Sequence, residues 1–194
     1  MPSKVFYLNS FFCQFDKHWI QNIFSIIIYK LVKELKMKSL VVFYSRTGNT
    51  KKVAEAIAKE LNADLEEIID KTKRSGLWGW LIAGRDASLN RLTTIEKPKK
   101  DPAQYELVIC GSPLWAFISS SPAIRSYVLE NAAKLKRVAF FLTMGGTKGK
   151  KALEDLEKLC GKKPIATLEI KESEISSQIF PQKVSDFCRS LKYA

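Results

Sequence analysis

One short run of residues combines the groups that bind phosphate, and it reads Ser45-Arg46-Thr47-Gly48-Asn49-Thr50. The run follows an apolar stretch and precedes an amphipathic one, so it is placed to open a helix. The first turn of a helix offers unpaired N–H groups and the positive end of the helix dipole. Such a turn binds a phosphate dianion without a lysine. A capping loop alone would explain one polar residue and leave the other hydroxyls and the glycine without a role, so we predict a phosphate site.

Two later segments also follow apolar runs and carry small, polar or aromatic residues. The first is Ser112-Pro113-Leu114-Trp115-Ala116-Phe117, and the second is Thr143-Met144-Gly145-Gly146. Two adjacent glycines let another group approach the backbone closely. Trp115 by itself is also explained as an aromatic residue buried under a loop.

Other kinds of site are excluded or disfavoured by the sequence. His18 is the only histidine, which rules out a two-histidine zinc site. A Ser-His-Asp hydrolase would have to use this histidine, which lies in the irregular N-terminal stretch. The stretch 145–150 (GGTKGK) fails the spacing of a P-loop. The four cysteines include no C-x-x-C pair, which favours a reduced, cytoplasmic protein. We predict no metal site and no catalytic side chain.

The positioning elements are strands and helices that alternate along the chain from residue 39 onward. Short apolar runs predict strands at Ser39–Tyr44, Leu65–Ile69, Tyr105–Gly111, Arg137–Leu142 and Ile165–Ile170. Amphipathic stretches predict helices at Thr50–Leu61, Pro122–Ala133, Gly149–Cys160 and Pro181–Leu191. This alternation predicts an α/β fold with three layers, a doubly wound five-stranded parallel sheet with helices on both faces.

The run 45–50, within VVFYSRTGNTKKVAEAIA, resembles the FMN phosphate loop of the flavodoxin-like family. The segment GSPLW resembles a version of the loop that lines the flavin ring, and the segment 143–146 resembles the other ring-contacting loop. The resemblance spans about residues 38 to 194 and implies the strand order 2-1-3-4-5, with FMN beyond the carboxyl ends of the strands. It also implies FMN contacts by the following residues, with Arg46 pointing outward: Ser45, Arg46, Thr47, Gly48, Asn49, Thr50, Ser112, Pro113, Leu114, Trp115, Thr143, Met144, Gly145 and Gly146.

Residues 1–36 differ from the rest, so we expect an N-terminal extension followed by a flavodoxin-like domain at 37–194. Apolar residues at a helical period between Trp19 and Leu35 indicate an amphipathic helix, too short and polar to span a membrane. Three interpretations stay open. Translation starts at Met37, or the helix packs on the domain or on a second copy in a homodimer, or the helix lies on a membrane surface.

The chain is strongly basic, with a net charge of +12, and half of that charge falls between residues 71 and 100. This insert has eight basic residues against Asp86 and Glu96, and it also contains Trp78 and Trp80. We expect part of it, residues 77–92, to be helical, and we expect anionic partners to be favoured over cationic ones. A solvated basic face is the plain alternative to a ligand or partner surface.

The resemblance leaves three functions open. The first is an FMN oxidoreductase that takes electrons from NAD(P)H and passes them to a quinone or other small acceptor. The second is a one-electron carrier that docks to redox partner proteins through the basic insert. The residues 112–117 contain no glycine that could flip beside the flavin, and Pro113 stiffens them, which favours the oxidoreductase. The third, a binding module that has lost its cofactor, is disfavoured by the intact phosphate loop, and we expect no nucleic-acid partner.

Overall fold

The computed structural model describes residue 25 and residues 37–71, 92–115, 119–146 and 149–192. The chain divides into two units, Met1–Met37 and Lys38–Ala194, and the second unit holds the fold described below. The predicted N-terminal helix and the predicted helix at residues 77–92 fall almost wholly outside the described residues. Among the described residues, no helix has the length and apolar character needed to cross a membrane.

Five parallel strands form the central sheet, in the order β2-β1-β3-β5-β6. Their bounds are β1 Ser39–Phe43, β2 Asp64–Glu67, β3 Leu107–Trp115, β5 Arg137–Met144 and β6 Thr167–Lys171. A sixth, two-residue strand, β4 (Ser119–Ser120), pairs antiparallel with the end of β3 and lies off this path. With β4 set aside, the order of the parallel strands is the predicted one. The direction of winding therefore reverses between β1 and β3.

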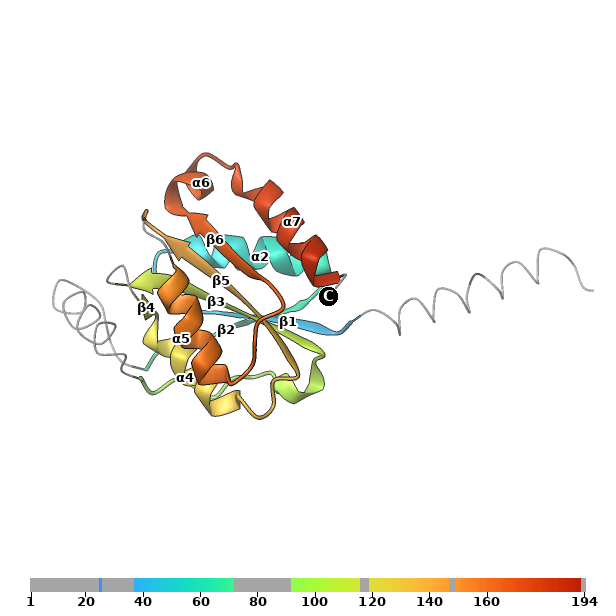
Figure 1. Ribbon diagram of the computed structural model, residues 1–194, viewed down its shortest axis with the longest axis vertical. Coiled ribbons are helices and arrows are strands. Elements are labelled where there is room, and N and C mark those ends of the chain that lie inside the picture. Colours follow the sequence, from blue (N-terminus) through green and yellow to red (C-terminus); the bar gives the residue numbers. More distant parts are fainter. Residues whose placement is uncertain (1–24, 26–36, 72–91, 116–118, 147–148, 193–194) are drawn as a thin grey trace, which may run out of the picture. The chain divides into compact units, whose positions relative to one another are not determined.

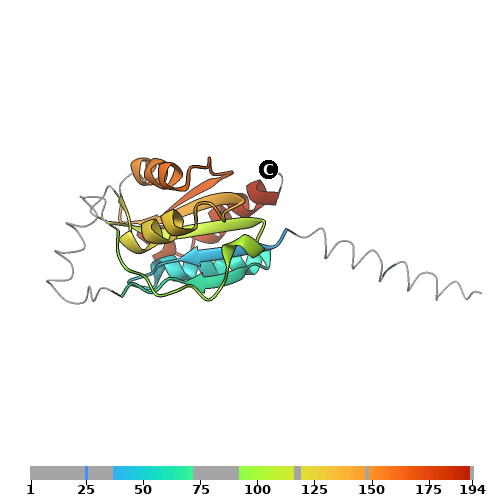
Figure 2. The same ribbon diagram turned by 90° about the horizontal axis from the view of Figure 1, so that it is seen from below.

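Helices cover both faces of the sheet (Figures 1 and 2). Helix α2 lies with α6 and α7 on one side of the sheet, and α4 and α5 lie on the other (Figure 1). The bounds are α2 Asn49–Leu61, α4 Pro122–Asn131, α5 Lys150–Cys160, α6 Glu172–Ser176 and α7 Phe180–Lys192, with a 3-10 turn, η2, at Pro102–Gln104. This arrangement confirms the predicted three-layer α/β fold.

The sequence accounts for most of these elements in physical terms. In α2 the apolar residues recur at helical spacing, and Val53, Ala54 and Ile57 are fully buried. Helix α5 ends at Gly161, whose φ of 66° is a left-handed conformation that glycine adopts without strain. The short helix α6 was missed because five residues are too few to display a helical period.

Strand β3 is longer than predicted, and this corrects the expected loop at residues 112–115. Pro113 pairs in register with Thr143 of β5, and Leu114 pairs with Ser120 of β4. The strand also packs tightly, since a Cβ added at Gly111 would lie 1.9 Å from the Phe141 ring. Ser112, Pro113, Leu114 and Trp115 therefore belong to the sheet.

The described ends of the basic insert lie next to one another. Asp70 and Ile95 form an antiparallel bridge, and the Thr93 hydroxyl donates to the Asp70 carboxylate at 2.8 Å. Ile95 is buried in the main core.

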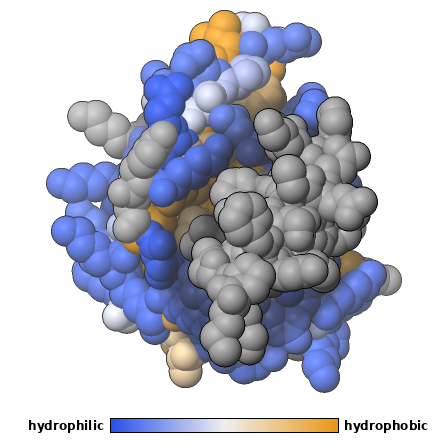
Figure 3. All heavy atoms as spheres, turned by 90° about the vertical axis from the view of Figure 1, so that its right-hand side faces the viewer, coloured by the Kyte–Doolittle hydropathy of each residue, from blue (hydrophilic) through white to orange (hydrophobic). Residues whose placement is uncertain are grey.

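Figure 3 views the side on which the C-terminus lies in Figure 1, and the coloured surface there is largely hydrophilic, with apolar side chains at the top and between the hydrophilic ones.

Candidate functional site

The run 45–50 forms a turn between β1 and α2, and its shape depends on Gly48. Gly48 is the residue before the first turn of α2 and has a φ of 90°, a left-handed conformation that other residues adopt with strain. No atom lies within 4 Å of the position where its Cβ would stand. The turn is held from within, because the Ser45 hydroxyl accepts the N–H groups of Gly48 at 3.1 Å and Lys51 at 3.2 Å.

The beginning of α2 keeps donors available for an anion. Within the part of the chain that the structure describes, no acceptor faces the backbone N–H groups of Asn49 and Thr50. The residue that precedes the helix, Gly48, has no side chain to cap it, so in the described structure Ser45 satisfies only the Lys51 N–H of the helix, and the first turn contains no acidic residue. Arg46 and Thr47 are exposed. Two open amides, a positive dipole end and nearby hydroxyls are a donor set that fits a phosphate group.

Thr50 links this turn to the end of β5. Its hydroxyl lies 2.8 Å from the hydroxyl of Thr143, and both side chains are buried. The contact spans the sheet, since β5 is separated from β1 by β3. The first and third predicted segments are therefore brought together by a hydrogen bond between buried side chains.

The first and second segments also meet. Tyr44 directly follows β1, and its N–H donates to the carbonyl of Gly111 on β3 at 3.2 Å. Its ring packs edge-on against the ring of Trp115, with 5.8 Å between the centroids. This aromatic pair lies where the winding of the sheet reverses, which is the crevice where doubly wound folds bind ligands.

The remaining predicted residues divide between interior and surface. Ser112 is fully buried, and its hydroxyl accepts the Ser121 N–H at 2.7 Å, so that hydroxyl is engaged within the protein. Met144 is buried and packs with Leu142. Gly145 and Gly146 follow β5 and are exposed.

A buried charge lies behind the end of β3. Arg125, in the first turn of α4, is 4% exposed, and its guanidinium donates to the hydroxyl of Ser119 on β4 at 3.3 Å. Burial lowers the pKa of Arg125, whereas the carboxylate of Asp155 on α5 acts in the opposite direction. The hydrogen bond from Arg125 links α4 to β4, which itself pairs with the end of β3.

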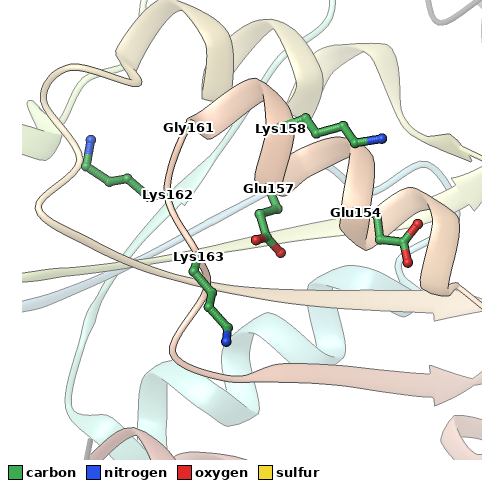
Figure 4. Close-up of a pocket in the computed structure, with 6 residues that line it drawn as sticks. All are labelled: Glu154, Glu157, Lys158, Gly161, Lys162 and Lys163. Carbon is green, nitrogen blue, oxygen red and sulfur yellow. The ribbon is translucent and has the colours of Figure 1, made fainter.

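Two surface hollows formed by described residues lie elsewhere. One, of about 380 Å³, is lined by Glu154, Glu157, Lys158, Gly161, Lys162 and Lys163 at the end of α5 (Figure 4). Its charges are of both signs, and the Lys162 side chain points away from the two carboxylates (Figure 4). A second, of about 440 Å³, includes Lys97, Lys99, Lys100 and Lys134 in its lining. Neither hollow includes a residue of the three predicted segments. The candidate site is therefore identified by the backbone and hydroxyl groups that these segments bring together.

Comparison with known proteins agrees with this geometry. The family model described as Flavodoxin matches residues 38–180. The chain belongs to the flavodoxin family. The match spans all five parallel strands and the three segments at their carboxyl ends, and it confirms the resemblance first suggested by the run 45–50.

Individual relatives of this flavodoxin family member are distant. An uncharacterized protein of Archaeoglobus fulgidus is 28% identical over 147 residues, which cover 74% of this chain and 91% of that protein. A crystal structure of a flavoprotein in complex with FMN from Lactobacillus acidophilus is 25% identical, with a TM-score of 0.61, and the match covers 73% of this chain and 97% of that one. The apo-form of the flavoprotein from the same organism matches with 23% identity and a TM-score of 0.55, over 72% of this chain and 95% of that one.

Sequence reasoning missed two contributors to the site. Tyr44 had been assigned to the first strand, and only the pairing of β1 with β3 brings it to Trp115. Arg125 looked like an ordinary helix residue, although a basic side chain among apolar neighbours on the buried face of a predicted helix is a signal that could have drawn attention to it.

Proposed function

We propose that this protein is an FMN-binding redox protein and that the turn Ser45–Thr50 holds the FMN phosphate. The observation that carries the proposal is the beginning of α2, where Gly48 is left-handed and the N–H groups of Asn49 and Thr50 face no acceptor in the described part of the chain. These groups, with the hydroxyls of Ser45 and Thr47, are donors, and a phosphate dianion accepts only. Membership of the flavodoxin family and the FMN complex of the Lactobacillus acidophilus flavoprotein support the same cofactor.

The flavin ring would lie against the ends of β1, β3 and β5. Trp115 and Tyr44 supply aromatic surface there, and Pro113 and Leu114 flank it on the same strand. Gly145 and Gly146 leave the backbone after β5 exposed and without side chains, so its N–H and C=O groups are accessible to a ring edge. These residues bind the ring and exclude water from it.

We further propose that the protein is an NAD(P)H-dependent oxidoreductase that passes two electrons to a quinone or other small acceptor. FMN supplies the electron-transfer chemistry when bound, so no catalytic acid or base is required of the chain. The supporting observation is the strand pairing of the described segment Ser112–Trp115. This segment lies in a strand that pairs with β5 on one side and β4 on the other, and it contains proline and no glycine. A peptide held in this way has little freedom to reorient during single-electron steps.

A one-electron carrier is the second candidate, and the basic surface favours it. One hollow is lined by four lysines, Lys97, Lys99, Lys100 and Lys134, and by two acidic residues, Asp101 and Glu130, so it keeps an excess of positive charge. Two of the lysines form ion pairs, Lys134 with Asp101 and Lys100 with Asp64. A surface of this charge attracts an acidic partner protein and speeds its docking at low salt.

Anaerobic visible spectroscopy of the FMN-loaded protein, before and after NADPH or NADH, separates the two candidates. The oxidoreductase predicts rapid bleaching of the flavin band, followed by reoxidation when a quinone is added. The carrier predicts a flavin that stays oxidised with NAD(P)H and takes up electrons one at a time in a dithionite titration. Failure of the protein to take up FMN would contradict both.

A charge-reversal variant provides the matched comparison. Lys97→Glu plus Lys99→Glu changes the basic hollow and leaves the three segments of the site intact. The oxidoreductase predicts an unchanged rate with a neutral quinone, because a neutral acceptor is not steered by charge. The carrier predicts slower electron transfer to an acidic protein acceptor, with the difference vanishing at high salt.

A further inference from the structure

The hydroxyl groups of Thr50 and Thr143 form a buried pair that joins the beginning of α2 to the end of β5. The two oxygens are 2.8 Å apart, and the residues are 93 positions apart in the chain. Thr50 is 2% exposed and Thr143 is 3% exposed. We propose that Thr143 is a positioning residue for the phosphate end of the site. It donates its proton to Thr50, so that the Thr50 hydroxyl points its own proton at the phosphate. This inference rests on the proposed FMN site.

The Thr50–Thr143 pair contains two hydroxyl protons, and the hydrogen bond between the two oxygens uses only one of them. Each hydroxyl has one proton to donate, and either oxygen of this pair could be the donor. Within the described residues the pair has no further hydrogen-bond partner, so one of the two protons remains without an acceptor. A buried hydroxyl proton without an acceptor is costly, and the pair therefore needs a third group.

The position of each threonine decides where that third group lies. Thr50 is the second residue of α2, and its own backbone N–H faces no acceptor among the described residues. Thr143 is the last residue but one of β5, and its neighbours in register on the two adjacent strands are Pro113 and Ile170. An anion at the beginning of α2 accepts the Thr50 proton, and the Thr143 proton is then satisfied by the Thr50 oxygen. The reverse direction leaves the Thr143 proton beside strand residues.

The inference changes the role that the family resemblance implies for Thr143. A ring contact would make Thr143 equally important for FMN and for riboflavin, which has the same ring and no phosphate. A residue that acts through Thr50 matters for FMN alone. The two ligands therefore distinguish the two roles in one protein.

The test is a pair of fluorescence titrations, with FMN and with riboflavin, on the full chain and on Thr143→Val. Valine keeps the shape and removes the hydroxyl. We expect the FMN dissociation constant to rise about five- to tenfold, because the variant loses the hydrogen bond that orients the Thr50 hydroxyl toward the charged phosphate. The riboflavin dissociation constant should change less than about twofold. Thr143→Ser retains the hydroxyl and should restore FMN binding to within about twofold. Thr167→Val, at an exposed threonine of β6 outside the site, is the control and should change neither constant.

A double-mutant cycle tests whether Thr143 acts through Thr50. In the Thr50→Val background, Thr143→Val should weaken FMN binding by less than twofold further, because the relay is already broken. Additive effects, an equal loss of FMN and riboflavin binding, or no loss of FMN binding by Thr143→Val would each overturn the inference. A wild-type protein that binds neither flavin would instead remove the proposed function, so the two failures are separable.

Discussion

The turn after β1 and the ends of β3 and β5 use their polar groups in opposite ways. In the turn, the amides of Asn49 and Thr50 face no acceptor within residues 37–71, 92–115, 119–146 and 149–192. At the ends of β3 and β5, the hydroxyls of Ser112 and Thr143 are buried and already bonded to other protein groups. In the functions proposed above, the turn binds the FMN phosphate, whereas buried hydroxyls at the strand ends position other protein groups. The comparison teaches that resemblance to a binding loop does not make every polar residue in that loop a ligand contact.

The largest expected effect tests how tightly β3 packs against β5 at Gly111, the residue before Ser112. Gly111→Ala places a methyl group 1.9 Å from the Phe141 ring. We expect a loss of about 3 kcal/mol in the free energy of unfolding, measured by urea denaturation, because overpacked cores cost this much. In a Phe141→Leu background the added cost of Gly111→Ala should fall below about 1 kcal/mol, since the clashing ring is gone. A full cost in that background would contradict the packing described here.

The next effect compares one serine from each region. Ser112→Ala leaves the buried Ser121 N–H without its acceptor, so we expect a loss of about 2 kcal/mol in stability. Ser45→Ala removes the acceptor of two N–H groups in a partly exposed turn, so it should cost about 1 kcal/mol or less. FMN affinity should show the reverse ranking, with the greater loss in Ser45→Ala. If the same variant had the larger effect on both thermal stability and FMN affinity, the two regions would not differ in the way described here.

The smallest effect compares two glycines with equally open surroundings. Gly48 and Gly145 both have free space where a Cβ would stand, but only Gly48 has a positive φ. Gly48→Ala should therefore cost about 1–2 kcal/mol of stability through backbone strain, and Gly145→Ala less than about 0.5 kcal/mol. Gly48→Asn should recover part of the loss, because asparagine tolerates the left-handed region better. Chemical denaturation of the three variants measures this, and an equal cost at the two glycines would place the strain elsewhere.

Much of the fold was accessible from sequence because its signals are local. Buried parallel strands and amphipathic helices differ in period, and apart from β3 their bounds were predicted to within two residues. The order of the strands came from the resemblance, since no local pattern reports which strands are neighbours. Strand β3 was predicted too short because its extension depends on partners. Pro113 and Leu114 become strand residues only when Thr143 and Ser120 lie beside them.

The sequence predicted one part of the candidate site, the turn 45–50, and missed the contacts between different elements. The turn 45–50 is one contiguous sequence, so its residue types alone indicated an anion site. The Tyr44–Trp115 pair, the Thr50–Thr143 pair and the bracing of Ser119 by Arg125 each join residues from different elements. Such contacts arise from tertiary packing, and a single sequence without its fold cannot report them.

The most direct test of the central claim compares FMN with riboflavin on the wild-type protein and on Thr47→Val plus Thr50→Val. If the turn after β1 holds the phosphate, FMN binds at least about tenfold more tightly than riboflavin to the wild type, since each charge-assisted bond contributes about 1.5–3 kcal/mol. The double variant should then lose about tenfold or more in FMN affinity while its riboflavin affinity stays unchanged. Equal affinities for the two flavins in the wild-type protein would contradict the claim.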